Sequence, residues 1–295
     1  MSVARFYIEH ETRYAYTAPV SQSWQLARLT PRTLAWQTPL SHALHIEPPP
    51  NERHDALDCF GNSVTHFALH GAHRVLRVRM QCTVEVGARA SLDVGDAADS
   101  WESVRDGMQA ARHGADLAAA RMCEPTRLVP LSEAARLYAA ASLMPGQDWL
   151  QSLLRLMQRI HRDFEFEPGA TTVSTSVDEV LIQRRGVCQD FAHLMLACLR
   201  GHGLPARYVS GYLLTEPPPG QPRLMGADAS HAWVAAYSPV HGWIEFDPTN
   251  DQLADARYIT LAWGTDFADV VPLRGVILGG GTQDMQVAVN VTPLA

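Results

Sequence analysis

The sequence predicts an α+β protein with an N-terminal antiparallel, sandwich-like β domain followed by an α+β core. Short runs of alternating, aromatic and β-branched residues fill the chain from residue 3 to about 95. The next fifty residues are alanine-rich and favour helices, and the remainder groups helical patterns before strand patterns, as α+β proteins do. The predicted units are an N-terminal β domain at 1–98, a helical connector at 99–148 and a core domain at 149–295.

The predicted N-terminal strands are separated by residues that favour turns. Pro, Gly, Asn and Asp occupy the intervening segments, as in PPPNERHD and DCFGNS. Strands at this spacing are typical of an antiparallel sandwich. The strand sequences are RFYIEH, TRYAYT, HALHIEP, NSVTHFAL and HRVLRVRMQCTVEV.

The core domain is predicted to begin with three helices. Apolar residues at 149, 150, 153, 154, 157 and 160 have the spacing of a helix with one buried face. Ser176 and Glu179 fit a capping box, which predicts a second helix from Val177. The third helix begins at Cys188 and ends at Gly201 or Gly203. The strands expected to follow are ARYVSGYLL, HAWVAAY, GWIEFDP, RYITLAW and QVAVNV.

Bulk composition excludes several classes of protein. The net charge of −7 argues against nucleic acid or an anionic membrane as the main partner. No apolar run reaches the roughly 20 residues that span a bilayer, and the N-terminus has no signal-peptide core, so we expect a cytoplasmic protein. The cysteines are odd in number and widely scattered, which fits a reducing compartment. They are Cys59, Cys82, Cys123, Cys188 and Cys198.

We predict neither a cofactor nor a metal site. The chain has no calcium-loop, phosphate-loop or dinucleotide-binding signature. The glycine run at 279–281 has no strand-to-helix context and no phosphate-binding lysine. The histidines of HFALHGAH are expected to have structural or surface roles.

Cys188 is the candidate nucleophile. It lies between a glycine-containing turn and the predicted helix QDFAHLMLACLRGHG. Exposed amide N–H groups and the positive end of the helix dipole both favour a thiolate at such a position. His193 is a poor base for this thiol because five residues along a helix rotate it by about 140°.

The candidate base and its orienting carboxylate come from a predicted hairpin across Ser238–Gly242. With Tyr237 opposite Trp243, His231 and Asp247 become diagonal neighbours on one face, with backbones roughly 7–8 Å apart. A bulge would move Asp247 to the opposite face, because side chains alternate along a strand. Cysteine, histidine and aspartate are the parts of a thiol acyl-transfer site.

Each of these residues has a predicted role. Cys188 attacks an amide or ester carbonyl, His231 pairs with the thiolate and then protonates the leaving amine, and Asp247 orients the imidazole. The backbone N–H of Cys188 is the expected oxyanion donor, and Gln183 is a candidate for a second one. Trp233 and Trp243 are candidate walls of a substrate channel, with core packing as the alternative.

The blocks RRGVCQDFAHL, GLPARYVSGYL, ADASHAWVAAY and GWIEFDPTN resemble the core of the transglutaminase-like superfamily. The stretch from YIEHETRYAYTAPV to FGNSVTHFAL resembles the small β domain that precedes this core in many bacterial members. The resemblance implies a papain-like α+β fold in which residues 149–295 form the catalytic core and Cys188, His231 and Asp247 the triad. The tryptophan oxyanion donor of the animal enzymes has no secure counterpart, although Trp149 lies upstream.

The resemblance leaves several functions open. The first is a cofactor-free enzyme that forms a thioester from a peptide or glutamine-type amide and passes it to an amine or water. The alternatives are a cysteine peptidase, with the loop 215–230 gating its substrate, and a peptide-binding or assembly protein without turnover. All 24 basic residues are arginine. Codon preference explains this, and a crosslinking enzyme would also gain by lacking ε-amines.

Overall fold

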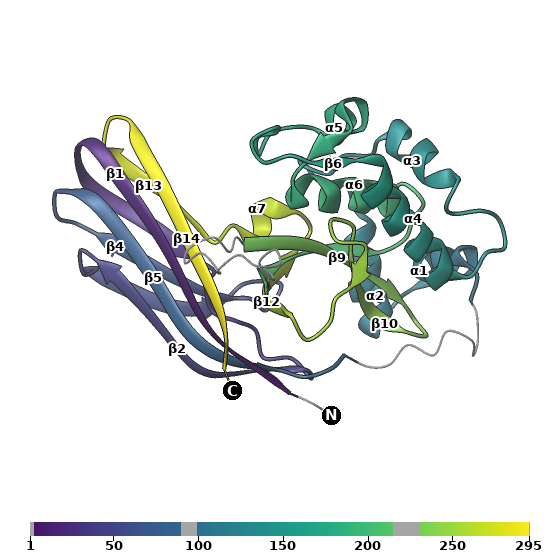
Figure 1. Ribbon diagram of the computed structural model, residues 1–295, viewed down its shortest axis with the longest axis horizontal. Coiled ribbons are helices and arrows are strands. Elements are labelled where there is room, and N and C mark those ends of the chain that lie inside the picture. The colour runs from purple at the N-terminus through teal and green to yellow at the C-terminus, as the bar shows by residue number, and fades with distance from the viewer. Residues whose placement is uncertain (1–2, 90–98, 215–229, 295) are drawn as a thin grey trace, which may run out of the picture.

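The computed structural model describes residues 3–89, 99–214 and 230–294. A curled antiparallel sheet lies beside a unit of helices and a second sheet (Figure 1). The sheet is built from both ends of the chain, and the α+β unit is built from its middle. The predicted α+β class with an antiparallel N-terminal sheet is confirmed.

The first sheet is a single curled sheet with the strand order β2-β5-β1-β4-β3. Its central strand β1 alternates in burial: Phe6, Ile8 and His10 point inward, and their neighbours are more exposed. This period of two is the pattern from which the sequence predicts strands. The strands are β1 (Ala4–Ala27), β2 (Gln37–Glu47), β3 (Glu52–Leu57), β4 (Ser63–Leu69) and β5 (His73–Val86).

Two C-terminal strands complete this sheet. The predicted core domain at 149–295 includes them, but they pair with the N-terminal strand. β13 (Leu273–Gly279) and β14 (Gln283–Leu294) both pair antiparallel with β1. The glycine run 279–281 forms the turn between them, with φ angles of +92°, +90° and +66° that favour glycine. The alternating pattern of QVAVNV predicts a strand. The strand with which it pairs, β1, lies at the other end of the chain.

The second sheet has the order β11-β10-β9-β8-β12 and is antiparallel throughout. Its strands are β8 (Ala206–Leu213), β9 (Ser230–Ser238), β10 (Gly242–Asp247), β11 (Gln252–Leu253) and β12 (Tyr258–Gly264). Helix α6 (Cys188–Arg200) packs against β8 and β9, and its side chains from Asp190 onward are buried. A buried helix on this sheet forms the centre of the α+β unit.

The remaining helices surround α6. The Ser176 capping box is confirmed: its hydroxyl accepts the N–H of Glu179, and the Glu179 carboxylate accepts the N–H of Ser176. Residues 90–98, which precede the predicted connector, lie outside the described residues. The other elements are α1 (Trp101–Ala110), α2 (Gly114–Ala120), a 3₁₀ turn at Arg121–Cys123, α3 (Glu133–Ala140), α4 (Trp149–Asp163), β6 (Glu165–Phe166), α5 (Val177–Gln183), β7 (Arg185–Gly186) and α7 (Phe267–Val270).

Polar contacts join the two layers along β12, which is the edge strand of the second sheet. The Gln37 side chain donates to the carbonyl of Thr260 and accepts its N–H, both at 2.8 Å. Asn62 does the same for Trp263, at 2.8 and 3.0 Å. These two amides take the place of a neighbouring strand and satisfy the edge.

The larger of two hydrophobic clusters contains buried side chains from both layers, and the smaller one, which includes Trp233 and Tyr258, belongs to the second sheet. His10 of β1 lies at the junction, where its ring hydrogen-bonds the Tyr212 hydroxyl of β8 at 2.8 Å. Within the described ranges, the helices are too short or too polar to cross a bilayer.

Candidate active site

Cys188 is the first residue of α6. Helix α5 ends before Arg184, whose φ of 56° lies in the left-handed region, and β7 then leads into the helix. Cys188 is half-buried, whereas the rest of the helix from Asp190 is buried. The fold therefore presents the thiol at the N-terminal end of a buried helix, where backbone N–H groups have no partner within the helix.

His231 and Asp247 meet on one face of the hairpin formed by β9 and β10. Trp243 pairs with Tyr237, which is the register predicted from the sequence. The His231 Nε2 lies 2.7 Å from the Asp247 Oδ2. The His231 side chain is 10% exposed and the Asp247 side chain is fully buried. The hairpin turn thus brings the base and the carboxylate together.

Asp247 accepts hydrogen bonds on both carboxylate oxygens. The Tyr258 hydroxyl and the Asn250 side-chain amide donate to Oδ2 at 2.6 and 2.7 Å, and the Thr249 N–H donates to Oδ1 at 2.8 Å. Burial raises the pKa of Asp247, but the bond to His231 and these donors outweigh it, so its pKa lies below the ordinary value. The carboxylate is therefore charged.

His231 lies between the Asp247 carboxylate and the Cys188 thiol. Burial lowers the pKa of His231, but its hydrogen bonds to Asp247 and Cys188 and the charges of both raise that pKa to about 10. Because Nε2 faces Asp247, Nδ1 is the nitrogen left for the thiol. The site thus favours an imidazolium between a carboxylate and a sulfur that can carry negative charge.

The other predicted site residues lie outside this set of hydrogen bonds. Gln183 is exposed at the last position of α5. Trp233 is fully buried and its ring lies 6.0 Å from that of His231. The Trp243 ring contacts that of Tyr237 at a tilt of 54°, at the opposite end of β10 from Asp247. Core packing, the alternative stated above, accounts for Trp233.

Trp149 and His193 are also buried side chains. Trp149 is 1% exposed at the start of α4 and stacks on His241 with ring centroids 5.8 Å apart. His193 is buried, and its Nε2 accepts the N–H of Phe267 at 3.2 Å. Burial lowers the pKa of His193 to about 4, which keeps it neutral.

Sequence reasoning missed Tyr258 and Asn250. Tyr258 begins β12, two strands from β9, and only the folded sheet brings its hydroxyl to Asp247. Asn250 follows Asp247 by three residues, and an Asp-Pro-Thr-Asn sequence after a strand indicates a turn in which such side chains bond locally. That signal could have identified Asn250.

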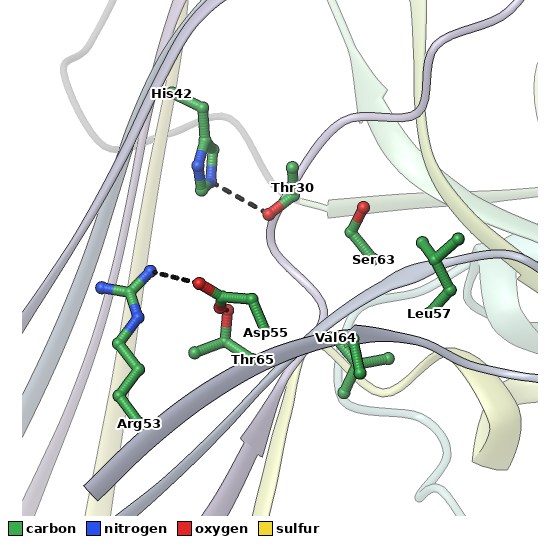
Figure 2. Close-up of a pocket in the computed structure, with 9 residues that line it drawn as sticks. Thr30, His42, Arg53, Asp55, Leu57, Ser63, Val64 and Thr65 are labelled. Atoms are coloured by element: carbon green, nitrogen blue, oxygen red, sulfur yellow. Dashed lines mark hydrogen bonds and ion pairs between the residues drawn. The ribbon is translucent and has the colours of Figure 1, made fainter.

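A pocket of about 430 Å³ lies in the first sheet, and Cys188, His231 and Asp247 do not line it. Figure 2 shows His42 directed at Thr30 and Arg53 directed at Asp55. Thr65 also donates to Asp55 at 2.5 Å. These polar groups of the pocket therefore satisfy one another.

Two other predictions concern the gating loop and metal binding. Residues 215–229 of the predicted gating loop lie outside the described residues. The described part of the chain holds no group of three or more His, Cys, Asp or Glu side chains that could bind a metal ion.

A cysteine at a helix start, beside a histidine that a carboxylate orients, is the arrangement of a cysteine-based enzyme. Comparison with known families agrees. Residues 6–85 match the bacterial transglutaminase-like N-terminal region, and residues 138–248 match the transglutaminase-like superfamily. The chain belongs to the transglutaminase-like superfamily.

Similar proteins extend over the full length of the chain. An uncharacterized protein of Mycobacterium tuberculosis is 40% identical over 300 residues, covering 98% of this chain and 93% of that protein. A protein-glutamine gamma-glutamyltransferase of Pseudomonas aeruginosa is 36% identical over 98 residues, 32% of this chain and 15% of that protein. The crystal structure of a putative cysteine protease from Cytophaga hutchinsonii matches with a TM-score of 0.78 and 20% identity, over 100% of this chain and 92% of that one. This last match shows the fold.

Proposed function

We propose that the protein is a cysteine acyltransferase that forms a thioester from a glutamine-type amide of a protein or peptide and passes it to an amine or to water. The observation that carries this proposal is the position of His231, which lies 2.7 Å from the Asp247 carboxylate and whose pKa both Asp247 and the Cys188 thiol raise. Cys188, His231 and Asp247 are then the catalytic residues. No step requires a cofactor or a metal.

In the first half-reaction the Cys188 thiolate attacks the amide carbon, and the carbonyl oxygen gains negative charge. The Cys188 backbone N–H, at the start of α6, is the proposed donor to that oxygen. When the carbon–nitrogen bond breaks, His231 gives its proton to the nitrogen, which leaves as ammonia from a glutamine side chain. Neutral His231 and a thioester remain.

In the second half-reaction an amine or water attacks the thioester carbon. His231 takes a proton from the attacking atom, the carbon–sulfur bond breaks and the thiolate–imidazolium pair returns. Asp247 stays ionised in both halves and stabilises the charged imidazole. An amine gives a new amide, and water gives a glutamate side chain.

Two observations support transfer to an amine. One is the likeness over 98 residues to a protein-glutamine gamma-glutamyltransferase. The other is the arginine-only set of basic residues, because the chain offers no lysine ε-amine that could accept its own acyl group.

The first experiment tests the thiolate–imidazolium pair. Alkylation of Cys188 by iodoacetamide, followed site by site by mass spectrometry, is expected to remain fast well below the pH of about 8.5 at which free thiols are half ionised. His231→Ala is expected to abolish that low-pH reactivity, and Asp247→Asn to weaken it. His70→Ala is the matched control, since this exposed histidine lies at the first sheet and its ring bonds Glu52. The proposal would be overturned if Cys188 of the wild type were alkylated slowly and His231→Ala did not change that rate.

The second experiment separates the possible reactions. A glutamine-containing peptide is incubated with and without a primary amine, and products are identified by mass. An amine adduct with ammonia release supports the proposal, and conversion to glutamate supports its hydrolytic branch. Cleavage of the peptide backbone would instead establish a cysteine peptidase. A reactive thiol without any product from a broad peptide set would favour a binding protein.

A further inference from the structure

Asp190 is a buried carboxylate two residues after the thiol, on the first turn of α6. It is 2% exposed, and within the described residues it forms no ion pair. Burial raises the pKa of Asp190, against the effect of its hydrogen bonds. A buried carboxyl group without a cation costs stability unless local hydrogen bonds compensate it.

One oxygen of Asp190 holds the turn before the thiol. Oδ2 accepts the N–H of Val187 at 2.8 Å and the hydroxyl of Thr171 at 2.6 Å. A Cβ on Gly186 would lie 2.7 Å from this same oxygen, so the carboxylate packs directly on the Gly186 backbone. The orientation of the peptide between Gly186 and Val187 is therefore fixed by Asp190.

The backbone of Asp190 fixes the next peptide. Its N–H donates to the Val187 carbonyl at 2.9 Å. Because a peptide unit is planar, holding the Val187 carbonyl also sets the direction of the Cys188 N–H on the other side of that unit. This N–H is the proposed oxyanion donor.

Thr171 connects this turn to a second segment. It lies between β6 and α5, and β6 pairs in parallel with β7, placing Phe166 beside Gly186. The Glu167 N–H also donates to the Gly186 carbonyl at 2.9 Å. The residues before the thiol are thus supported from one side by backbone pairing and from the other by Asp190.

We infer that Asp190 is a positioning residue: through its bonds to the Val187 N–H and Thr171, its carboxylate holds the turn in which the backbone directs the Cys188 N–H at the carbonyl oxygen of the acyl donor. This inference rests on the proposed function. It predicts that Asp190 matters where an oxyanion develops and matters little where none does. It also predicts that hydrogen-bond acceptance, which asparagine retains, is what counts.

The test compares two reactions of the same thiol in the full chain. Acylation by p-nitrophenyl acetate forms an oxyanion, breaks the carbon–oxygen bond and releases p-nitrophenolate, whereas alkylation by iodoacetamide forms no oxyanion. Removing one oxyanion donor typically costs 10²–10³ in rate. We expect Asp190→Ala to slow acylation about 100-fold at nearly unchanged alkylation, and Asp190→Asn to change both by less than about fivefold.

Thr171→Val is the milder variant, since it removes one of the two donors to Oδ2 and keeps the side-chain shape. We expect it to slow acylation by about three- to tenfold, at unchanged alkylation. Protection of the buried Cys198 from alkylation shows that each variant is folded. The complete pH profile of both reactions is recorded for each.

The outcomes separate this inference from the proposed function. If the wild type alkylates fast at low pH and is acylated, the proposed function stands, and equal acylation of Asp190→Ala would overturn the inference. It would also be overturned if both reactions slowed together, or if Asp190→Asn were as slow as Asp190→Ala. A wild type with an unreactive thiol would overturn the proposed function, and the inference with it.

Discussion

At the scale of residues, His231 and Asp247 link folding to pH. In a folded chain His231 has a pKa of about 10, above its ordinary value of 6.5, because Asp247 and Cys188 favour its charged form against the cost of burial. A raised pKa contributes stability that is complete below the unfolded value and is lost as the pH rises through the folded one. Asp247 acts in the opposite direction, since its lowered pKa contributes stability that is lost in acid.

His231→Gln is therefore expected to destabilise the protein most at a pH of about 6 or below, and progressively less as the pH approaches 10. The measurement is urea unfolding of both proteins across this range. His202→Gln is the comparison. Burial lowers the pKa of His202, so its contribution to stability is not lost as the pH rises. A destabilisation by His231→Gln that grew with rising pH would contradict a charged imidazole.

At the scale of elements, the sequence specified local features and left distant ones open. The turn at Ser238–Gly242 determines the register of β9 and β10, so the sequence placed His231 beside Asp247. The capping box before α5 was equally local. The partner of β14 and the bond from Tyr258 to Asp247 depend on how distant strands assemble, which alternation along a strand does not encode.

The edge of β12 offers a prediction at this scale. The side chain of the fully buried Asn62 bonds the backbone N–H and carbonyl of Trp263. It also bonds Asp58 and Arg32, so Asn62→Ala removes the Asn62 partner from all of these part-buried groups. We expect a loss of about 2–4 kcal/mol in unfolding free energy, measured by urea titration. Asn51→Ala is the control, since exposed Asn51 accepts one N–H, from His70. Similar losses in both variants would mean that the amide does not replace a strand.

At the scale of the whole molecule, the chain ends and the middle are expected to unfold together. Strand β14 pairs with β1, the buried His10 of β1 bonds Tyr212 of β8, and the larger hydrophobic cluster contains buried side chains from both layers. The boundaries drawn from sequence at residues 98 and 148 follow changes in composition. Composition reports which elements form, whereas cooperativity depends on contacts between segments far apart in the chain.

Two buried cysteines allow this to be tested, because Cys82 lies in the first sheet and Cys198 in α6. In pulsed alkylation across a urea series, both thiols are expected to become reactive at one midpoint. Val289→Ala, in the buried part of β14, should lower both midpoints equally, by about 2 kcal/mol of unfolding free energy. Val287→Ala makes the same change at an exposed position of that strand and should move neither. If Cys82 reacted at lower urea than Cys198, or Val289→Ala moved Cys82 alone, the sheet would be an independent domain.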